Sequence, residues 1–415
     1  MRFARSVIAS AEKETGFLMS AMRVFRKGFP VIAGLAIVAI VGFAGGLPPA
    51  HAGGISRGRG GRPVLAAKTA PVRAALAPAT SYREAGGLTG VAAAAGDNAW
   101  AVGYAGSSTA PRILMLHWNG SAWSKVTSRQ LKLIGAAGNL SAIAVVNARD
   151  AYAVGYTGST TGTTHTLLLH WNGSTWSTVT SPAPVSGGAL TAVTATTKGA
   201  WAVGYYATGP SALDYWSLAF RRSGATWSRV SSNANDLTFT GVATTSAGTS
   251  WAIGNQVAMI TGDLATWSGT GWNWVHSFPV QGTYHSLNGI AAGPGGIAFA
   301  VGANGNVPVT PALSMRWTGR AWVQAPVSAP AGSLLDAVTF APGGTAWAAG
   351  STGPDPMIVR WNGRAWTRLT TPASTAQLTG IGFSAANDGW AVGEASLASG
   401  GTRTLILHWN GRKWS

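Results

Sequence analysis

The chain offers few of the side chains that enzymes use for chemistry. It contains no cysteine, which removes disulfides, thiolate nucleophiles and cysteine metal ligands together. Glu394 is the only glutamate after Glu84. A two-carboxylate glycosidase needs its carboxyl groups about 5 to 9.5 Å apart, and the sequence shows no obvious pair. We therefore expect no catalytic residues.

Aspartate and histidine recur at fixed places along the chain. Asp97, Asp150 and Asp388 each lie between two apolar segments, which is typical of turn residues. Other copies of the same pattern carry arginine where three of them carry histidine; the histidines are His117, His170 and His408. A metal site would keep its ligands fixed, so we expect no metal centre and no cofactor.

One group of aromatic and polar residues lies outside every repeated motif. Its members are Tyr205, Tyr206, Asp214, Tyr215 and Trp216, with Tyr284 and His285 further along the chain. Ordinary exposed loop residues are the alternative interpretation. We take these seven as ligand-binding candidates.

Seven copies of one pattern must position these side chains. Each copy starts with an apolar residue, passes through Trp-Ala-Val-Gly or a variant, and ends in Trp-Asn-Gly-x-x-Trp or a variant. The copies start at Leu88, Leu140, Leu190, Phe239, Leu287, Leu335 and Leu378. A period of 52 to 43 residues with only strand-like segments is typical of propeller blades. We predict an all-β fold, a seven-bladed β-propeller of four-stranded antiparallel blades over residues 88–415.

The first copy predicts strands a to d of a blade, from the axis outward, at residues 88–94, 98–104, 113–118 and 122–127. Asn-Gly after strand c is a strong hairpin signal, and it would place the flanking Trp118 and Trp123 opposite each other. Eighteen of the 20 tryptophans hold such repeated positions. Tryptophan can stack on sugars, but we interpret these eighteen as scaffold.

The spacing between motifs varies on one side of the blades only. The a-to-b and c-to-d steps are nearly constant, whereas the b-to-c and d-to-a segments differ in length between copies. In a propeller these two variable segments lie on the same face, and insertions on one face of a repeat protein usually mark the binding face. We expect the function to lie there.

The repeat resembles the Asp-box (BNR) and photosystem-assembly-factor-like propellers, whose blades carry a Trp-Ala-Val-Gly-like strand followed by Asp-x-Gly-x-x-Trp. The resemblance covers residues 88–415, and Gly120-Ser-Ala-Trp123 and its counterparts keep the Gly-x-x-Trp end. Trp118 and its counterparts stand where that motif has aspartate. The resemblance implies the fold, while sialidase activity, which some of these families possess, does not follow from a turn motif.

The N-terminus predicts export. Arg23, Arg26 and Lys27 precede an apolar run over residues 31–43 and an Ala-x-Ala site ending at Ala52. We predict a signal peptide over residues 1–52, cleaved after Ala52, and a secreted, extracellular protein. An uncleaved membrane anchor is the alternative, although a span needs about 20 apolar residues. Residues 53–87 are rich in Gly, Pro, Ala and Arg and predict a flexible leader.

The net charge of +17 invites a nucleic-acid interpretation. The basic residues of the repeats are scattered, however, and no run is longer than Arg221-Arg222 or Arg412-Lys413. We expect no specific nucleic-acid partner. The simpler interpretation of these basic residues is a mildly cationic surface. The more specific interpretation is a loose attraction to anionic cell-wall polymers.

The seventh copy stops at Ser415, where its outer strand should run. We expect part of residues 60–86 to supply that closing strand; a truncated chain is the alternative. The leading hypothesis is a non-catalytic scaffold that binds an extracellular or cell-envelope protein or polysaccharide through the b-to-c and d-to-a loops. The alternative is a glycan hydrolase at the mouth of the central channel using Asp214, Asp355 or Glu394.

Overall fold

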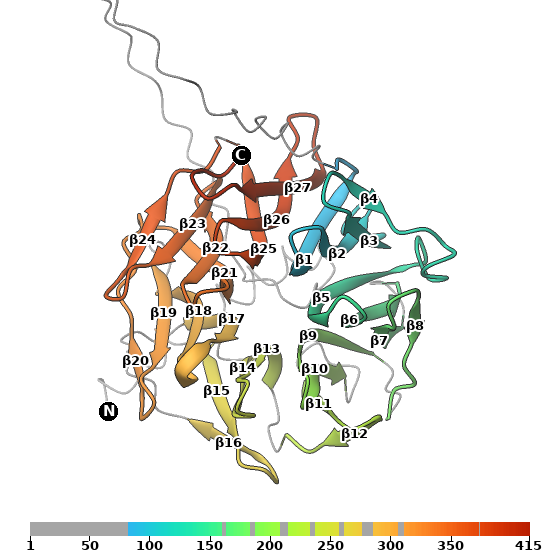
Figure 1. The fold of residues 1–415 in the computed structure, drawn as a ribbon, viewed down its shortest axis with the longest axis horizontal. Coiled ribbons are helices and arrows are strands. Elements are labelled where there is room, and N and C mark those ends of the chain that lie inside the picture. Colours follow the sequence, from blue (N-terminus) through green and yellow to red (C-terminus); the bar gives the residue numbers. More distant parts are fainter. Residues whose placement is uncertain are drawn as a thin grey trace, which may run out of the picture.

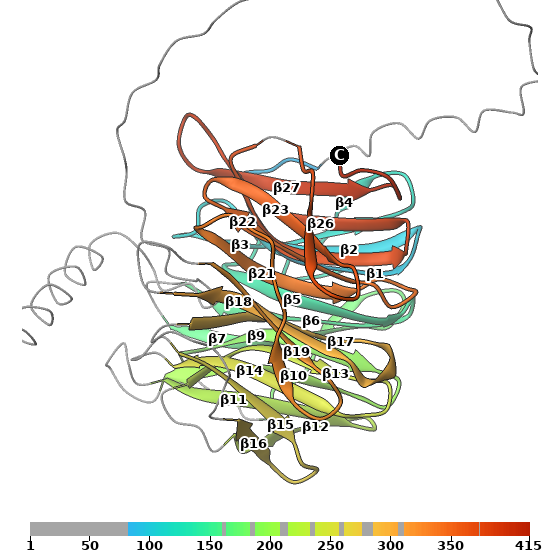
Figure 2. The same cartoon turned by 90° about the vertical axis from the view of Figure 1, so that its left-hand side faces the viewer.

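A computed structural model gives the fold of the chain as a ring of seven β-sheets around a central channel (Figure 1). The predicted seven-bladed propeller is confirmed, and Figure 2 shows the ring edge-on. The structure describes residues 82–159, 163–182, 187–207, 215–232, 237–256, 261–275, 285–305, 311–372 and 374–415. The predicted signal peptide and most of the leader lie outside these residues.

Each blade is an antiparallel sheet whose strands follow the chain outward from the axis. The strands of blades 1 to 3 are β1 (Gly86–Ala95), β2 (Asn98–Ala105), β3 (Arg112–Trp118), β4 (Trp123–Lys125), β5 (Gly138–Asn147), β6 (Asp150–Gly158), β7 (Thr164–Trp171), β8 (Trp176–Thr178), β9 (Gly188–Thr196), β10 (Gly199–Ala207), β11 (Tyr215–Ser223) and β12 (Thr226–Val230). Those of blades 4 and 5 are β13 (Leu237–Thr244), β14 (Ser250–Gln256), β15 (Gly262–Trp267), β16 (Trp272–Val275), β17 (His285–Ala292), β18 (Ala298–Asn304), β19 (Ala312–Trp317) and β20 (Trp322–Gln324), with a 3-10 turn η1 (Pro294–Gly296). Those of blades 6 and 7 are β21 (Ser333–Phe340), β22 (Ala346–Thr352), β23 (Asp355–Trp361), β24 (Trp366–Leu369), β25 (Ala376–Ala385), β26 (Asp388–Ser396) and β27 (Thr402–Trp409).

The repeated aromatic residues hold neighbouring blades together. In blade 1, Trp118 and Trp123 pair across the hairpin with ring centroids 5.8 Å apart. Trp390 of blade 7 packs against both rings, at 5.9 Å from each. The aromatic residue of one blade's strand b thus meets the hairpin pair of the next blade. Tilted and edge-to-face rings at these distances add about 0.5 to 1.5 kcal/mol per pair beyond their burial.

The third copy, which lacks the first hairpin tryptophan, keeps this contact by other means. Arg222 stands at that position, and its guanidinium carbon lies 5.6 Å from the ring centroid of Tyr152 in blade 2. Trp227, the second member, still meets Tyr152 edge-on at 5.7 Å. A cation over an aromatic face thus replaces an aromatic pair. The repeated tryptophans are buried or half-buried, which agrees with their interpretation as scaffold.

A β-bulge explains why strand b always carries glycine after its aromatic residue. Strand a of blade 7 shifts register between Leu378 and Gly380, which pushes its backbone against Gly393. A Cβ atom at Gly393 would lie 1.9 Å from the carbonyl oxygen of Gln377. Gly103 of blade 1 meets the same obstacle, 2.2 Å from the carbonyl oxygen of Gly87. Only glycine fits at this position.

The residue that follows the first apolar residue of each repeat lies near the axis, and in several blades it links strand a to the next blade. Thr379 Oγ1 donates to the carbonyl oxygen of Leu88 at 2.5 Å, from blade 7 to blade 1. Thr89, Thr191 and Thr240 make the same bond to blades 2, 4 and 5. Blade 6 carries Asp336 at this position in place of a threonine.

Both ends of the described chain lie beside β27, the third strand of blade 7. His408 and Ser415 exchange backbone hydrogen bonds of 2.9 and 3.0 Å, so the C-terminal residues start an outer strand. At the other end of β27, Thr404 N donates to the carbonyl oxygen of Glu84 at 2.9 Å, and Ala85 bridges Arg403. Residues 82–85 therefore join blade 7 to blade 1. The rest of the segment expected to close the ring, residues 60–81, lies outside the described residues.

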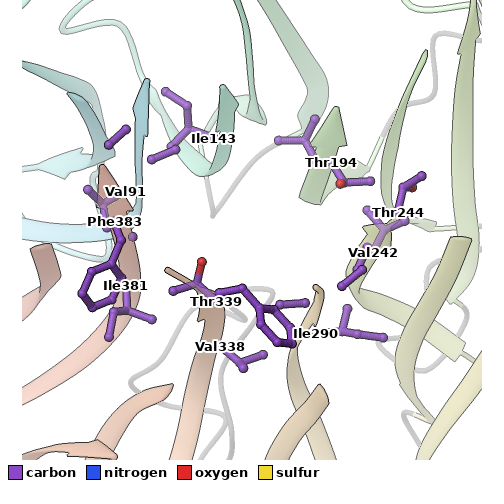
Figure 3. A pocket seen from close by; sticks show the side chains of 18 residues that line it. Val91, Ile143, Thr194, Val242, Thr244, Ile290, Val338, Thr339, Ile381 and Phe383 are labelled. Atoms are coloured by element: carbon purple, nitrogen blue, oxygen red, sulfur yellow. The ribbon is translucent and has the colours of Figure 1, made fainter. Parts of the chain in front are cut away.

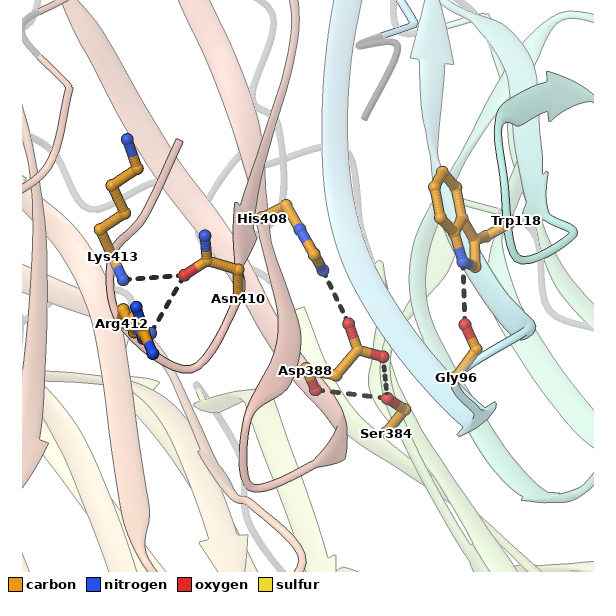
Figure 4. A network of polar contacts seen from close by, with 8 residues as sticks. All are labelled: Gly96, Trp118, Ser384, Asp388, His408, Asn410, Arg412 and Lys413. Carbon is orange, nitrogen blue, oxygen red and sulfur yellow. Dashed lines mark hydrogen bonds and ion pairs between the residues drawn. The ribbon is translucent and has the colours of Figure 1, made fainter. Parts of the chain in front are cut away.

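In blades 2 and 7, the recurring aspartate and histidine form a side-chain contact between strands b and c. His408 Nε2 lies 2.7 Å from Asp388 Oδ1, and Ser384 donates to the other oxygen of that carboxylate (Figure 4). His170 makes the same contact with Asp150 at 3.0 Å. In blade 1 the partner of His117 is an asparagine, so Asp97 takes no part. Because the serine hydroxyl contacts the carboxylate and not the imidazole, this network lacks the order of a catalytic triad.

In the part of the chain that the structure describes, no helix has the length and apolar character needed to cross a membrane.

Candidate binding site

The residue directly after the strand b glycine lies at the end of strand b where the chain turns toward strand c. This end of the channel is the one that carries the variable b-to-c and d-to-a segments. The seven blades place different side chains there, namely Tyr104, Tyr156, Tyr205, Asn255, Ala303, Ser351 and Glu394. Three tyrosines therefore stand on blades 1 to 3, with a carboxylate beside them on blade 7.

Glu394 is joined to the first of these tyrosines. Tyr104 Oη donates to Glu394 Oε2 at 2.8 Å, across the junction between blades 1 and 7. Gly87 leaves room for this contact, since a Cβ atom there would lie 2.7 Å from Glu394 Oε2. Burial, and then the charge of Glu394, raise the pKa of Tyr104. The phenol is therefore neutral at neutral pH.

Tyr156 and Tyr205 continue the arc onto blades 2 and 3. Burial raises the pKa of each, and Tyr156 lies close enough to Tyr104 and Tyr205 to raise theirs as well. Tyr215 meets Tyr205 edge-on with ring centroids 5.1 Å apart. The hydroxyl groups of Tyr156 and Tyr205 make no hydrogen bond within the described residues. We call Tyr104, Tyr156, Tyr205, Tyr215 and Glu394 the mouth cluster.

The structure splits the blade 3 candidates between two faces of one hairpin. Tyr206 pairs with Trp216 across β10 and β11, while the neighbouring Tyr205 faces the other side of the sheet with Tyr215. The guanidinium carbon of Arg229 lies 4.7 Å from the ring centroid of Tyr206, and Trp216 is 42% exposed. Neighbouring residues of a strand point to opposite faces, so the described candidates of blade 3 form two separate pairs.

Of the remaining candidates, the structure describes only His285. His285 lies at the start of β17 in blade 5, where its Nε2 is 3.1 Å from the carbonyl oxygen of Gly262. Asp214 and Tyr284 lie outside the described residues. Asp355, assigned to the alternative hydrolase site, is exposed at the start of β23, whereas Glu394 belongs to the mouth cluster.

A polar group on blades 5 to 7 lies next to the same end of the channel. Asp336 accepts a hydrogen bond from Gln377 Nε2 at 3.0 Å and one from Asn288 Nδ2 at 3.3 Å. Gln377 is the cross-strand partner of Glu394, which connects this group to the mouth cluster. The carboxyl group of Asp336 is enclosed by protein atoms, although the residue as a whole is partly exposed to solvent. Burial raises its pKa to about 7, and the two amide donors reduce that rise.

A cavity of about 330 Å³ opens toward the other end of the channel (Figure 3). Residues of the seven innermost strands line it, including Val91, Ile143, Thr339 and Phe383, and none of its lining side chains is titratable. Most of its aliphatic side chains also pack between blades, which ties them to the scaffold. This cavity offers the hydroxyl groups of Thr194, Thr244 and Thr339 but no charged side chain, so the mouth cluster, which has a carboxylate, is the better candidate.

No group of three or more potential metal ligands occurs within the described ranges. The mouth cluster combines one carboxylate with four phenol rings, and within the described residues only the hydroxyl of Tyr104 has a hydrogen-bond partner. Such a set can bind a ligand through charge, aromatic contact and hydrogen bonds. The sequence interpretation missed Tyr104 and Tyr156, although aligning the residue after each strand b glycine would have found them.

Comparison with known proteins agrees with the fold. No protein-family model and no curated protein sequence matches the chain. A solved structure of YCF48 bound to D1 peptide is 13% identical, with 80% of this chain and 98% of that chain covered and a TM-score of 0.49. YCF48 from Cyanidioschyzon merolae is 14% identical, with 78% and 96% covered and a TM-score of 0.49. The GH74 xyloglucanase from Xanthomonas campestris is 14% identical, with 80% of this chain and 56% of that chain covered and a TM-score of 0.51. At 14% identity, the likeness to the xyloglucanase shows the fold and nothing more specific.

Proposed function

We propose that this protein is a secreted, non-catalytic binding scaffold that recognises an extracellular or cell-envelope partner through the mouth cluster. The observation that carries the proposal is the convergence of Tyr104, Tyr156, Tyr205 and Glu394 from four blades at one end of the channel. Rigid strands position all four side chains. A site built on such elements is preorganised, which reduces the entropy that binding costs.

The chemistry of the cluster favours binding over catalysis. Its one carboxylate already accepts a hydrogen bond from Tyr104. Asp336, which contacts the cross-strand partner of Glu394, has both oxygens engaged by amide groups of neighbouring blades. A hydrolase would need a second carboxyl group free to reach the substrate.

Matched hydroxyl deletions on the two faces of the blade 3 hairpin test the proposal. Purified protein, Tyr205→Phe and Tyr206→Phe are compared as baits for cell-envelope extracts and on a glycan array. Tyr205→Phe should lose binding, because its hydroxyl belongs to the mouth cluster, and Tyr206→Phe should keep it. Equal binding by both variants would reject the mouth cluster as the site.

A panel of glycosidase substrates separates the alternative function. We expect binding without turnover. Turnover that is lost in Glu394→Gln and kept in Asp355→Asn would establish a hydrolase at the channel mouth instead.

A further inference from the structure

The only formal charge in the mouth cluster is negative. Glu394 forms no ion pair with any described basic residue. Burial raises the pKa of Tyr104, Tyr156 and Tyr205, so these phenols are neutral at neutral pH. An unpaired, half-buried carboxylate is costly unless a cation joins it. Elsewhere the chain is strongly basic, with a net charge of +17. A negative charge at this point is therefore a local feature of the site.

One acceptor group in the cluster and one beside it have fewer donors within the described chain than they can accept. Glu394 receives only the Tyr104 hydroxyl within the described chain. Asn139, the cross-strand partner of Tyr156, is 5% exposed, and its Oδ1 atom is buried without a donor. A buried acceptor without a donor costs about 1 to 3 kcal/mol. A ligand rich in N–H groups would supply the donors that the Glu394 carboxylate lacks, whereas Asn139 Oδ1, which is closed to solvent, would be reached only if neighbouring side chains moved.

We propose that the mouth cluster binds an organic cation with several N–H donors, either a guanidinium or a primary ammonium group. The proposal rests on the proposed function, since it names the ligand chemistry of the same site. A guanidinium offers five N–H donors and a primary ammonium three, and both carry the charge that Glu394 lacks. The rings of Tyr104, Tyr156 and Tyr205 add an aromatic surface that attracts cations.

Other ligand classes fit these observations less well. A neutral sugar hydroxyl donates a single proton and leaves the carboxylate without a counter-charge. An anionic group would be repelled by Glu394. A quaternary ammonium ion carries charge but has no N–H group for Asn139 or the carboxylate.

Titration calorimetry on the full chain with four small probes tests the proposal. The probes are n-butylguanidinium, n-butylammonium, tetramethylammonium and n-butanol. We expect the first two to bind about 10-fold or more tightly than the last two, since a hydrogen bond to a charged group contributes about 1.5 to 3 kcal/mol. Glu394→Gln should weaken their binding about 10-fold or more. Asp355→Asn removes an exposed carboxylate outside the cluster and should leave binding unchanged.

Three results would overturn the proposal. One is equal binding of tetramethylammonium and n-butylammonium; another is a Glu394→Gln variant that stays folded by thermal melting and binds as the parent does. The third is an absence of binding by all four probes. If Tyr205-dependent capture of an envelope partner survives any of these results, only the ligand chemistry is wrong and the proposed function stands.

A second set of ligands distinguishes the source of the cation. Short peptides that contain arginine or lysine are compared with an oligomer of glucosamine, which also carries primary ammonium groups. Glu394-dependent binding of the peptides indicates a protein partner, and Glu394-dependent binding of the oligomer indicates a polysaccharide. Either result supports a cation site, whereas binding of both that does not depend on Glu394 contradicts it.

Discussion

Asp336 should make the stability of the propeller depend on pH. Burial raises its pKa from 3.8 to about 7, so the folded chain holds a proton that the unfolded chain releases. Between these two values the folded state binds more protons, and the free energy of unfolding therefore falls as pH rises. The contribution is fully present below pH 3.8 and is lost above about pH 7. Asp336→Asn replaces the carboxyl with a neutral group of similar shape and should remove this dependence.

The pKa values set the magnitude of the effect. A difference of about 3 pH units corresponds to about 4 kcal/mol at 1.36 kcal/mol per unit. Partial exposure of Asp336 to the channel screens the charge, so we expect about 1 to 3 kcal/mol. For a folded unit of roughly 330 residues, the melting temperature shifts about 1.5 °C per kcal/mol. The variant should therefore melt about 2 to 4 °C above the parent at pH 8 and within about 1 °C of it at pH 4.

Calorimetric melting curves of the two proteins from pH 4 to pH 8 measure this difference. Taking the difference cancels the titration of the other carboxyl groups. Asp355→Asn, at an exposed carboxyl, is the matched control and should follow the parent at every pH. Parallel curves for the parent and Asp336→Asn would refute the reasoning.

Two further substitutions test the scaffold. Gly393→Ala places a Cβ atom against the Gln377 carbonyl oxygen and should lower the free energy of unfolding, measured by denaturant titration, by about 2 to 3 kcal/mol. Gly271→Ala is the control, because a Cβ atom there would lie in open space, and it should lower that free energy far less. Equal losses would contradict the role of the bulge. Trp414→Ala removes a ring that packs on Trp347 and Trp409 and should lower the free energy of unfolding by about 3 to 5 kcal/mol. Trp216→Ala removes an exposed ring and should change that free energy by under about 1 kcal/mol. A mild effect at Trp414 would show that the last blade closes without it.

The repeated residues were the predictable part of the fold. Trp118 and Trp123 lie opposite each other as their spacing around Asn-Gly predicts, because hairpin geometry is local. The contact of both rings with Trp390 could not be predicted in the same way. It joins residues at opposite ends of the chain, and only closure of the ring brings them together.

The candidate site was predictable only in part. Tyr205 and Tyr215 were chosen because aromatic residues gather in that segment, and they do pack together. Composition does not say which face of a strand a side chain takes, and Tyr206 lies on the opposite face of the hairpin from Tyr205. Tyr104 and Glu394 meet at the junction of blades 1 and 7, although they are 290 residues apart in the sequence. A reading along the chain has no local signal for such a contact.

The hydrogen bonds between Glu84 and Thr404 also constrain the order of events during synthesis. The two residues are 320 positions apart. At roughly 5 to 20 residues per second, a ribosome needs about 15 to 60 s to make the intervening chain. Residues 82–85 therefore emerge long before β27 exists, and for that time the first blade lacks its final neighbour. A nascent chain can build its blades one after another, but the ring itself can form only once the last strand has left the ribosome.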